Sequence, residues 1–344
     1  MQIIRSAIIV LLAGTWFAGS VQTVEAQGRA EMAIQKNDKD GDGKVSIDEW
    51  RKRRGIFRRL DTDEDGYVTL KEFRQRFGET EAAREADKKA VEASTLEGLT
   101  TASAVDRETL CAIARGRSCS IKLAIKKGLF ETGLRPKFPD QANCRDIDEQ
   151  WAISYTNKRD REAYHGGIDM PAPYGVPMIA TAAGTVVAIY RGENSFRGKE
   201  MTIRHAPEDT GIPLWIYTQY AHFDEMPKFK VGDRVKMGQE LGPTGNSGIG
   251  RNGLQSQRRR PAIHFAVFFS KSPKFIDRRE RIVQVDGNWM DPNALFRKKL
   301  PLDSYSMRDL PEAEKQVPIS VMMADGTTIP TDTKIVWPYK CKAN

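Results

Sequence analysis

Histidine and cysteine are scarce in this chain of 344 residues, which has four of each. None of the cysteines has the close paired spacing of zinc-finger ligands, and this excludes a cysteine-bound metal. Long apolar runs are also missing after residue 18, which excludes membrane-spanning helices from the body of the chain. No nucleic-acid-binding motif is present. These absences leave a globular protein of about two domains.

The N-terminus is predicted to be an export signal, residues 1–26. Arg5 supplies a positive start, residues 6–18 form an apolar run, and Val24-Glu25-Ala26 offers small residues for cleavage before Gln27. An uncleaved signal anchor is the alternative. Export predicts a periplasmic or secreted protein with one or two disulfides, and the spacing leaves all three pairings open for Cys111, Cys119, Cys144 and Cys341.

The formal net charge of +8 suits contact with an anionic polymer, either a membrane surface, nucleic acid or a bacterial wall. Export argues against nucleic acid. The short basic clusters at 51–54 and 258–260 are typical of solvated faces. A wall or an outer-membrane surface is therefore the expected partner.

Two tandem stretches, residues 38–49 and 61–72, have the EF-hand pattern. Acidic residues stand at loop positions one, three and five, glycine permits the sharp turn at six, and glutamate at twelve closes the calcium shell with two oxygens. A single match is also compatible with a solvated acidic loop, but two in tandem favour calcium. The predicted ligands, with position seven using its backbone carbonyl, are Asp38, Asp40, Asp42, Lys44 and Glu49, then Asp61, Asp63, Asp65, Tyr67 and Glu72.

The short separation of these loops predicts one compact calcium-binding domain, residues 27–78, in which residues 50–60 serve both hands. Extracellular calcium is about millimolar, so sites of ordinary affinity stay filled and are predicted to be structural before regulatory. The predicted core of this domain comprises Trp50, Ile56, Phe57, Leu60 and Phe73.

The rest of the chain is predicted to form a helical linker or accessory region at 79–150, a β domain at 151–296 and a C-terminal extension at 297–344 that is polar and contains several prolines. Residues 96–127 favour helix. Within the β domain, residues 178–190 are β-branched and interrupted by Gly184, which predicts a hairpin. The predicted fold class is multi-domain α+β, with a small helical EF-hand pair and an antiparallel β-sheet domain.

All four histidines, His165, His205, His222 and His264, fall within the predicted β domain. His165 lies four residues before Asp169, with Gly166 and Gly167 between them, and imidazole and carboxylate are both preferred zinc ligands. Such a pair is also compatible with a turn at the surface. Four histidines in one domain favour a metal site.

Several segments in order resemble the lysostaphin or LytM-like zinc metallo-endopeptidases, which cut peptidoglycan cross-links. They are HGGIDM at 165–170, GVPMIATAAGTVV at 175–187, YAHF at 220–223, VGDRVKMGQELGPTGNSG at 231–248 and IHFAVF at 263–268. The resemblance covers about residues 151–293. It implies that Zn²⁺ is bound by His165, Asp169 and His264, and that His222 assists catalysis beside the metal.

The chain departs from this family at Ala262, where the family has the first histidine of a His-x-His pair. The longer segment that precedes it, residues 251–261, contains candidate replacements, and the sequence leaves open which of them reaches the site: Gln255, Gln257 or one of Arg258 to Arg260. The resemblance implies no comparable role for His205, which is predicted to be a second-shell or surface residue.

Two functions follow. The first is a zinc-dependent endopeptidase that hydrolyses peptide cross-links of peptidoglycan, with structural calcium sites. The second is a non-catalytic relative that binds the wall or activates a partner wall hydrolase. Because all three metal ligands are retained, the enzyme is favoured, and Ala262 is where its activity is in doubt.

Overall fold

A computed structural model describes residues 29–50, 54–78, 96–116, 119–153, 164–249, 259–278 and 280–344. The predicted export signal lies outside these residues, as do residues 79–95 and 117–118 of the predicted linker or accessory region. Within the described ranges, no helix has the length and apolar character needed to cross a membrane.

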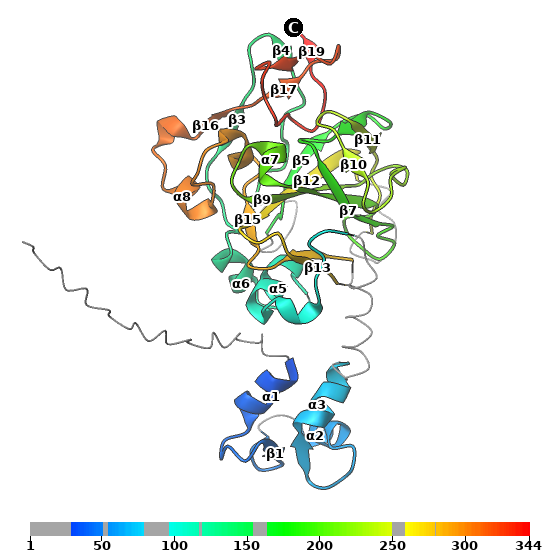
Figure 1. Cartoon of the computed structure of the whole chain (residues 1–344), viewed down its shortest axis with the longest axis vertical. Coiled ribbons are helices and arrows are strands. Elements are labelled where there is room, and N and C mark those ends of the chain that lie inside the picture. Colours follow the sequence, from blue (N-terminus) through cyan, green and yellow to red (C-terminus); the bar gives the residue numbers. More distant parts are fainter. Residues whose placement is uncertain are drawn as a thin grey trace, which may run out of the picture.

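The N-terminal part is a helical EF-hand pair, as predicted (Figure 1). Its elements are α1 (Arg29–Asn37), β1 (Lys44–Ser46), α2 (Arg54–Leu60), β2 (Tyr67–Thr69) and α3 (Leu70–Phe77). The strands β1 and β2 pair in antiparallel fashion and place Val45 opposite Val68. Both valines stand at position eight of their loops, and neither is exposed to solvent. This pairing holds the two loops side by side.

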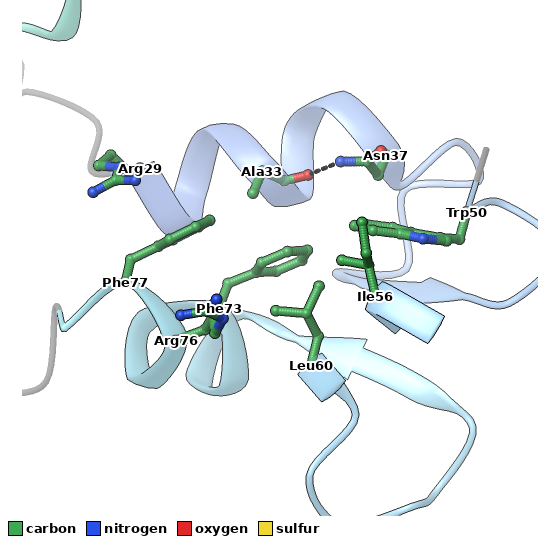
Figure 2. Close-up of a pocket in the computed structure, with 9 residues that line it drawn as sticks. All are labelled: Arg29, Ala33, Asn37, Trp50, Ile56, Leu60, Phe73, Arg76 and Phe77. Atoms are coloured by element: carbon green, nitrogen blue, oxygen red, sulfur yellow. Dashed lines mark hydrogen bonds between the residues drawn. The ribbon is translucent and has the colours of Figure 1, made fainter. Parts of the chain in front are cut away.

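Aromatic side chains fill the space between these helices (Figure 2). Trp50, Phe57, Leu60 and Phe73 are buried there, as predicted. Ile56 was predicted to join this core, but its side chain is 37% exposed and lines the mouth of a cavity of about 400 Å³. The prediction for Ile56 was wrong because hydrophobicity alone does not tell which face of a seven-residue helix packs inward.

The larger part of the protein is built around an antiparallel sheet (Figure 1). In chain order, its elements as far as β12 are η1 (Ala102–Ala104), α5 (Arg107–Ala114), α6 (Ile121–Lys126), β3 (Arg135–Lys137), β4 (Ala142–Asn143), β5 (Ile168–Pro171), β6 (Pro177–Ile179), β7 (Gly184–Tyr190), β8 (Glu200–His205), α7 (Pro207–Thr210), β9 (Trp215–Ala221), β10 (Arg234–Val235), β11 (Glu240–Pro243) and β12 (Ala262–Ser270). The remaining elements are β13 (Phe275–Asp277), β14 (Ile282–Gln284), β15 (Asn288–Met290), η2 (Ala294–Arg297), α8 (Ser304–Arg308), η3 (Glu312–Glu314), β16 (Gln316–Pro318), β17 (Val321–Met322), β18 (Thr328–Ile329) and β19 (Lys342–Ala343).

The main sheet has seven strands in the order β10-β7-β8-β9-β12-β15, and β5 also pairs with β12. The predicted hairpin within residues 178–190 was wrong. Strand β6 pairs with β11 in a separate two-stranded sheet, whereas β7 pairs with β8 and β10. Gly184 is the first residue of β7, and the two strands belong to different sheets because each finds its partner further along the chain.

One hydrophobic core runs from the helices before the sheet to the C-terminus. It includes Ile113 of α5, Phe265 of β12 and, in the predicted C-terminal extension, Trp337 and Tyr339. The helices within 96–127 are short segments instead of one long helix, and α5 packs on β14 and β15. The cysteines form two disulfides, as predicted, and the structure decides the pairing: Cys111–Cys119 and Cys144–Cys341.

Candidate metal centre

The register of strand β12 brings two of the predicted zinc ligands together. Its antiparallel pairing with β5 puts His264 directly opposite Asp169. His165 precedes β5 by one turn and points to the same place. The structure therefore gathers His165, Asp169 and His264 into one cluster of candidate ligands, and all three residues are buried.

Three donor atoms of this cluster converge. Nε2 of His165 lies 3.1 Å from Oδ1 of Asp169 and 3.1 Å from Nδ1 of His264. Nδ1 of His264 lies 2.9 Å from Oδ1 of Asp169. A triangle with these sides has a circumradius of about 1.75 Å, which is shorter than a zinc–ligand bond of about 2.0–2.1 Å. A single cation can thus contact all three atoms.

Hydrogen bonds outside the triangle aim these donors inward. Nδ1 of His165 donates to the carbonyl of Gln150 at 3.0 Å, which leaves the lone pair of Nε2 facing the other ligands. The backbone of Asp169 is held by Asp148 and Glu149, since Asp148 N–H donates to its carbonyl and its own N–H donates to Glu149, both at 3.0 Å. Two imidazoles and one carboxylate held in this way form the donor set of a catalytic zinc site.

The pKa values of the triad indicate that a positive charge among its three side chains is favourable. Burial lowers the pKa of His165, but the carboxylate of Asp169 outweighs it and leaves this pKa above its ordinary value. Burial raises the pKa of Asp169, but His165 and His264 hold it well below its usual range. A proton or a cation among the three groups satisfies the converging lone pairs, and the residues present fit zinc.

Gly166 and Gly167 matter for space and not for backbone conformation. Neither has a positive φ. A β-carbon on Gly167 would lie 2.7 Å from the His264 ring, and one on Gly166 would lie 2.8 Å from the Trp289 ring. Trp289 is in turn fixed by a hydrogen bond from its Nε1 to the carbonyl of Ala112 in α5. The helical region before the sheet thus supports the turn that carries His165.

His222 follows the last residue of β9 and lies beside the triad, with its ring centroid 5.9 Å from that of His264. Its φ of 69° is in the left-handed region, and the backbone is pinned there because His222 N–H donates to Arg197 and Gly245 N–H donates to the His222 carbonyl. Nδ1 donates to the carbonyl of Ser247 at 2.7 Å. The lone pair of Nε2 is therefore directed away from Ser247.

Arg259 is the residue of the predicted candidate set that the structure places against His222. Its Nη1 lies 3.0 Å from Nδ1 and 3.2 Å from Nε2 of His222 and donates to the carbonyl of Phe196 at 2.8 Å. Burial and this guanidinium lower the pKa of His222 to about 3. Arg260 pairs with Asp148, and the other three candidates, Gln255, Gln257 and Arg258, lie outside the described residues.

Ala262 is 1% exposed and begins β12, two residues before His264 and on the same face of the strand. A methyl group therefore occupies the position from which the resemblance expects a histidine. His205 is neither at the surface nor beside the triad: it is fully buried, with Nδ1 against the carbonyl of Ala183 and Nε2 against Thr218 Oγ1. Its role is to connect neighbouring strands.

The EF-hand loops gather their acidic residues at positions one, three and twelve. The clusters are Asp38, Asp40 and Glu49 in the first loop and Asp61, Asp63 and Glu72 in the second. The predicted ligands at position five lie outside these clusters: Asp42 accepts from the Lys44 N–H and Asp65 from the Tyr67 N–H. Lys44 and Tyr67, the position-seven residues, belong to β1 and β2.

The last glutamate of the second loop has two tasks. Its Oε1 accepts from the Thr62 N–H at 2.6 Å at the start of the loop. Its Oε2 accepts from the Thr69 N–H at 2.8 Å in a capping box at the start of α3. Glu72 thus closes the loop and begins the helix, and Glu49 contacts Lys39 and Ser46 in the corresponding way in the first loop.

Comparison with known proteins gives a family for each part. The profile described as "Peptidase family M23" matches residues 163–275, and the profile described as "EF hand" matches residues 33–52 and 54–77. An uncharacterized metalloprotease of Buchnera aphidicola subsp. Baizongia pistaciae (strain Bp) is 27% identical over 123 residues, which is 35% of this chain but only 28% of that protein.

Matches to solved structures cover comparable shares of the chain. A zinc-containing peptidase from Vibrio cholerae is 22% identical, with a TM-score of 0.30, over 46% of this chain and 40% of that one. The catalytic domain of the prophage-encoded M23 protein EnpA from Enterococcus faecalis, in an alanine-to-histidine variant, is 25% identical with a TM-score of 0.29, over 44% and 95% of the two chains. The catalytic domain of lysostaphin from Staphylococcus simulans is 21% identical with a TM-score of 0.29, over 38% and 84%.

Proposed function

Because residues 163–275 form a domain of peptidase family M23 that follows an EF-hand region, we propose that this protein is a zinc-dependent endopeptidase which hydrolyses peptide cross-links of bacterial peptidoglycan. The observation that carries the proposal is the convergence of one carboxylate and two imidazoles on a point beside a further buried histidine. This is the donor set of a hydrolytic zinc site with an open position.

His165, Asp169 and His264 would hold the metal. When bound, zinc lowers the pKa of a water molecule and polarises the carbonyl of the scissile bond. The chain's own residues orient these groups: the Gln150 carbonyl fixes the His165 tautomer, and pairing with β12 fixes Asp169. The proposal gives His222 the role of proton acceptor: Nδ1 donates to the Ser247 carbonyl, so Nε2 keeps a lone pair that can take a proton from the attacking water.

Peptidoglycan is the proposed substrate because the chain combines a peptidase domain with a net charge of +8 and a predicted export signal. A wall polymer rich in carboxylates favours a basic protein. The same reasoning supports a periplasmic or secreted location, with the wall or the outer-membrane surface as a partner and no role in nucleic-acid binding. In a calcium-rich medium the EF-hand pair is proposed to hold calcium permanently and to serve as a structural unit.

Cleavage of purified cross-linked muropeptides, followed by chromatography and mass spectrometry, tests the proposal. We expect cross-links to be opened by zinc-loaded protein, and this activity to be lost when zinc is removed with calcium retained, or in His222→Ala. The absence of the usual histidine at position 262 favours the second function, a wall-binding factor that activates another hydrolase. That function would be supported if zinc-loaded wild type and Ala262→His both left every cross-link intact.

A further inference from the structure

The tautomer of His222 limits what this residue can do. Nδ1 lies 2.7 Å from a carbonyl oxygen, which can only accept, so the ring proton of neutral His222 is on Nδ1. Nε2 is then an acceptor. Neutral His222 can take a proton through Nε2, but it has no N–H with which to stabilise the negative oxygen that forms when water adds to a peptide carbonyl.

Arg259 supplies a donor at this place. Its Nη1 lies 3.0 Å from Nδ1 and 3.2 Å from Nε2 of His222, so the guanidinium lies against the imidazole ring, close to both nitrogens. Two carbonyls position it from outside the triad, that of Phe196 at 2.8 Å and that of Ser247 at 3.4 Å. The Ser247 carbonyl therefore orients both His222 and Arg259, and the two side chains form one unit.

The charge of this unit differs from that of a histidine pair. A guanidinium remains protonated at every working pH, whereas a second imidazole would carry a charge over only part of that range. Arg259 also reaches His222 from the segment just before β12, two residues upstream of Pro261. Its contact with His222 therefore does not need a polar side chain at Ala262.

We propose that Arg259 is a catalytic residue that stabilises the oxyanion of peptide hydrolysis and divides the work with His222, which accepts the proton. The inference rests on the proposed function. In the step, the water oxygen bonds to the carbonyl carbon while a water proton passes to Nε2 of His222. The carbonyl oxygen becomes negative beside the guanidinium. The C–N bond then breaks, and His222 returns the proton to the leaving amine, so no further reactant is needed.

The resting contact between Arg259 and His222 is compatible with this division. The guanidinium disfavours a proton on His222, but an oxyanion between the substrate and Arg259 offsets the positive charge as the reaction proceeds.

Hydrolysis of a cross-linked muropeptide by zinc-loaded Arg259→Gln is the first test. We expect kcat to fall by about 10²–10³, the usual loss when one oxyanion donor is removed, with unchanged zinc content and thermal stability. Arg259→Lys, which keeps the charge and loses the planar fork, should recover part of the loss. Arg260→Gln removes the neighbouring charge, which pairs with Asp148, and should retain activity within about threefold.

Binding of inorganic phosphate provides a readout that does not depend on hydrolysis. Calorimetry on the metal-free and the zinc-loaded protein should give an affinity at least several-fold weaker for Arg259→Gln than for wild type and for Arg260→Gln. Equal phosphate affinity in all three proteins would overturn the proposal, as would full activity of Arg259→Gln. If wild type cuts no cross-link, the proposed function fails, whereas the phosphate comparison still decides whether Arg259 binds an oxyanion.

Discussion

The two candidate metal-binding regions of this protein bring their predicted ligands together in different ways. In the EF-hand pair, every predicted ligand of a loop lies within twelve consecutive residues. In the M23 domain, His165 and His264 are 99 positions apart and meet only because β12 pairs with β5. The calcium loops therefore depend mainly on local turns, whereas the zinc triad depends on the register of a whole sheet.

Despite this difference, both regions orient their candidate ligands by hydrogen bonds to the backbone. In each region, backbone groups hold at least one of the candidate ligand side chains in place. Thr62 and Thr69 fix the carboxylate of Glu72, and the Gln150 carbonyl fixes the ring of His165. Such preorganisation reduces the entropic cost of binding an ion.

Replacement of a triad ligand is expected to give the largest effect, with zinc binding lost and calcium binding kept. We expect His264→Ala to lower zinc affinity by more than about 100-fold, the upper range for loss of a second-shell partner, and to abolish hydrolysis. Calcium binding should be unchanged, because the EF-hand ligands come from another part of the chain. Metal analysis after dialysis measures both ions.

The matched control is His205→Gln, which removes a buried histidine that hydrogen-bonds Ala183 and Thr218 and does not belong to the triad. This variant should retain one zinc per chain. Zinc retained at wild-type affinity by His264→Ala would contradict the assignment of the site.

Protonation of His205 at acid pH should lower the free energy of unfolding of the M23 domain. Burial lowers the pKa of His205 from 6.5 to about 4. Between these two pH values, His205 is protonated in the unfolded chain and neutral in the folded protein. Its contribution to the free energy of unfolding is therefore complete above about pH 6.5 and is lost as the pH falls toward 4. The loss amounts to about 3 kcal/mol.

Urea unfolding of wild type and His205→Gln at pH 7, 5.5 and 4.5 in calcium checks this expectation. Protonation of the triad is common to both proteins, so the difference between their free energies of unfolding reports His205 alone. Parallel pH profiles for the two proteins would contradict it.

Charge removal at position twelve of each calcium loop should have the smallest effect. Glu72→Gln and Glu49→Gln should each weaken calcium binding roughly tenfold at their own loop, because ligand charge sets EF-hand affinity. The larger loss is expected for Glu72, which is 4% exposed and therefore less screened by solvent than Glu49. Calcium titration by calorimetry measures both.

Zinc content and peptide hydrolysis in millimolar calcium should not change in either variant. If Glu72→Gln lost hydrolysis at saturating calcium, the EF-hand pair would have to act on the M23 domain, and the separation of the two regions would not hold.

The parts of the site that were predictable are those with short-range or family patterns. The calcium loops follow from acidic residues and glycine at set positions, and the structure adds the pairing of Val45 with Val68. His165, Asp169 and His264 were selected from the family resemblance, and the structure brings them together. Ile56 and the hairpin at 178–190 were wrong because solvent exposure and strand partners depend on distant residues.

By itself, the amino-acid sequence determined the two EF-hand loops, through residue types at fixed spacing, and the α+β class, and it indicated the candidate zinc ligands through the family resemblance. Only the tertiary structure decided that Arg259 lies beside His222, that Gly167 makes room for His264, and that Cys144 pairs with Cys341. These contacts join segments whose meeting depends on strand order and core packing, and no local pattern encodes that outcome.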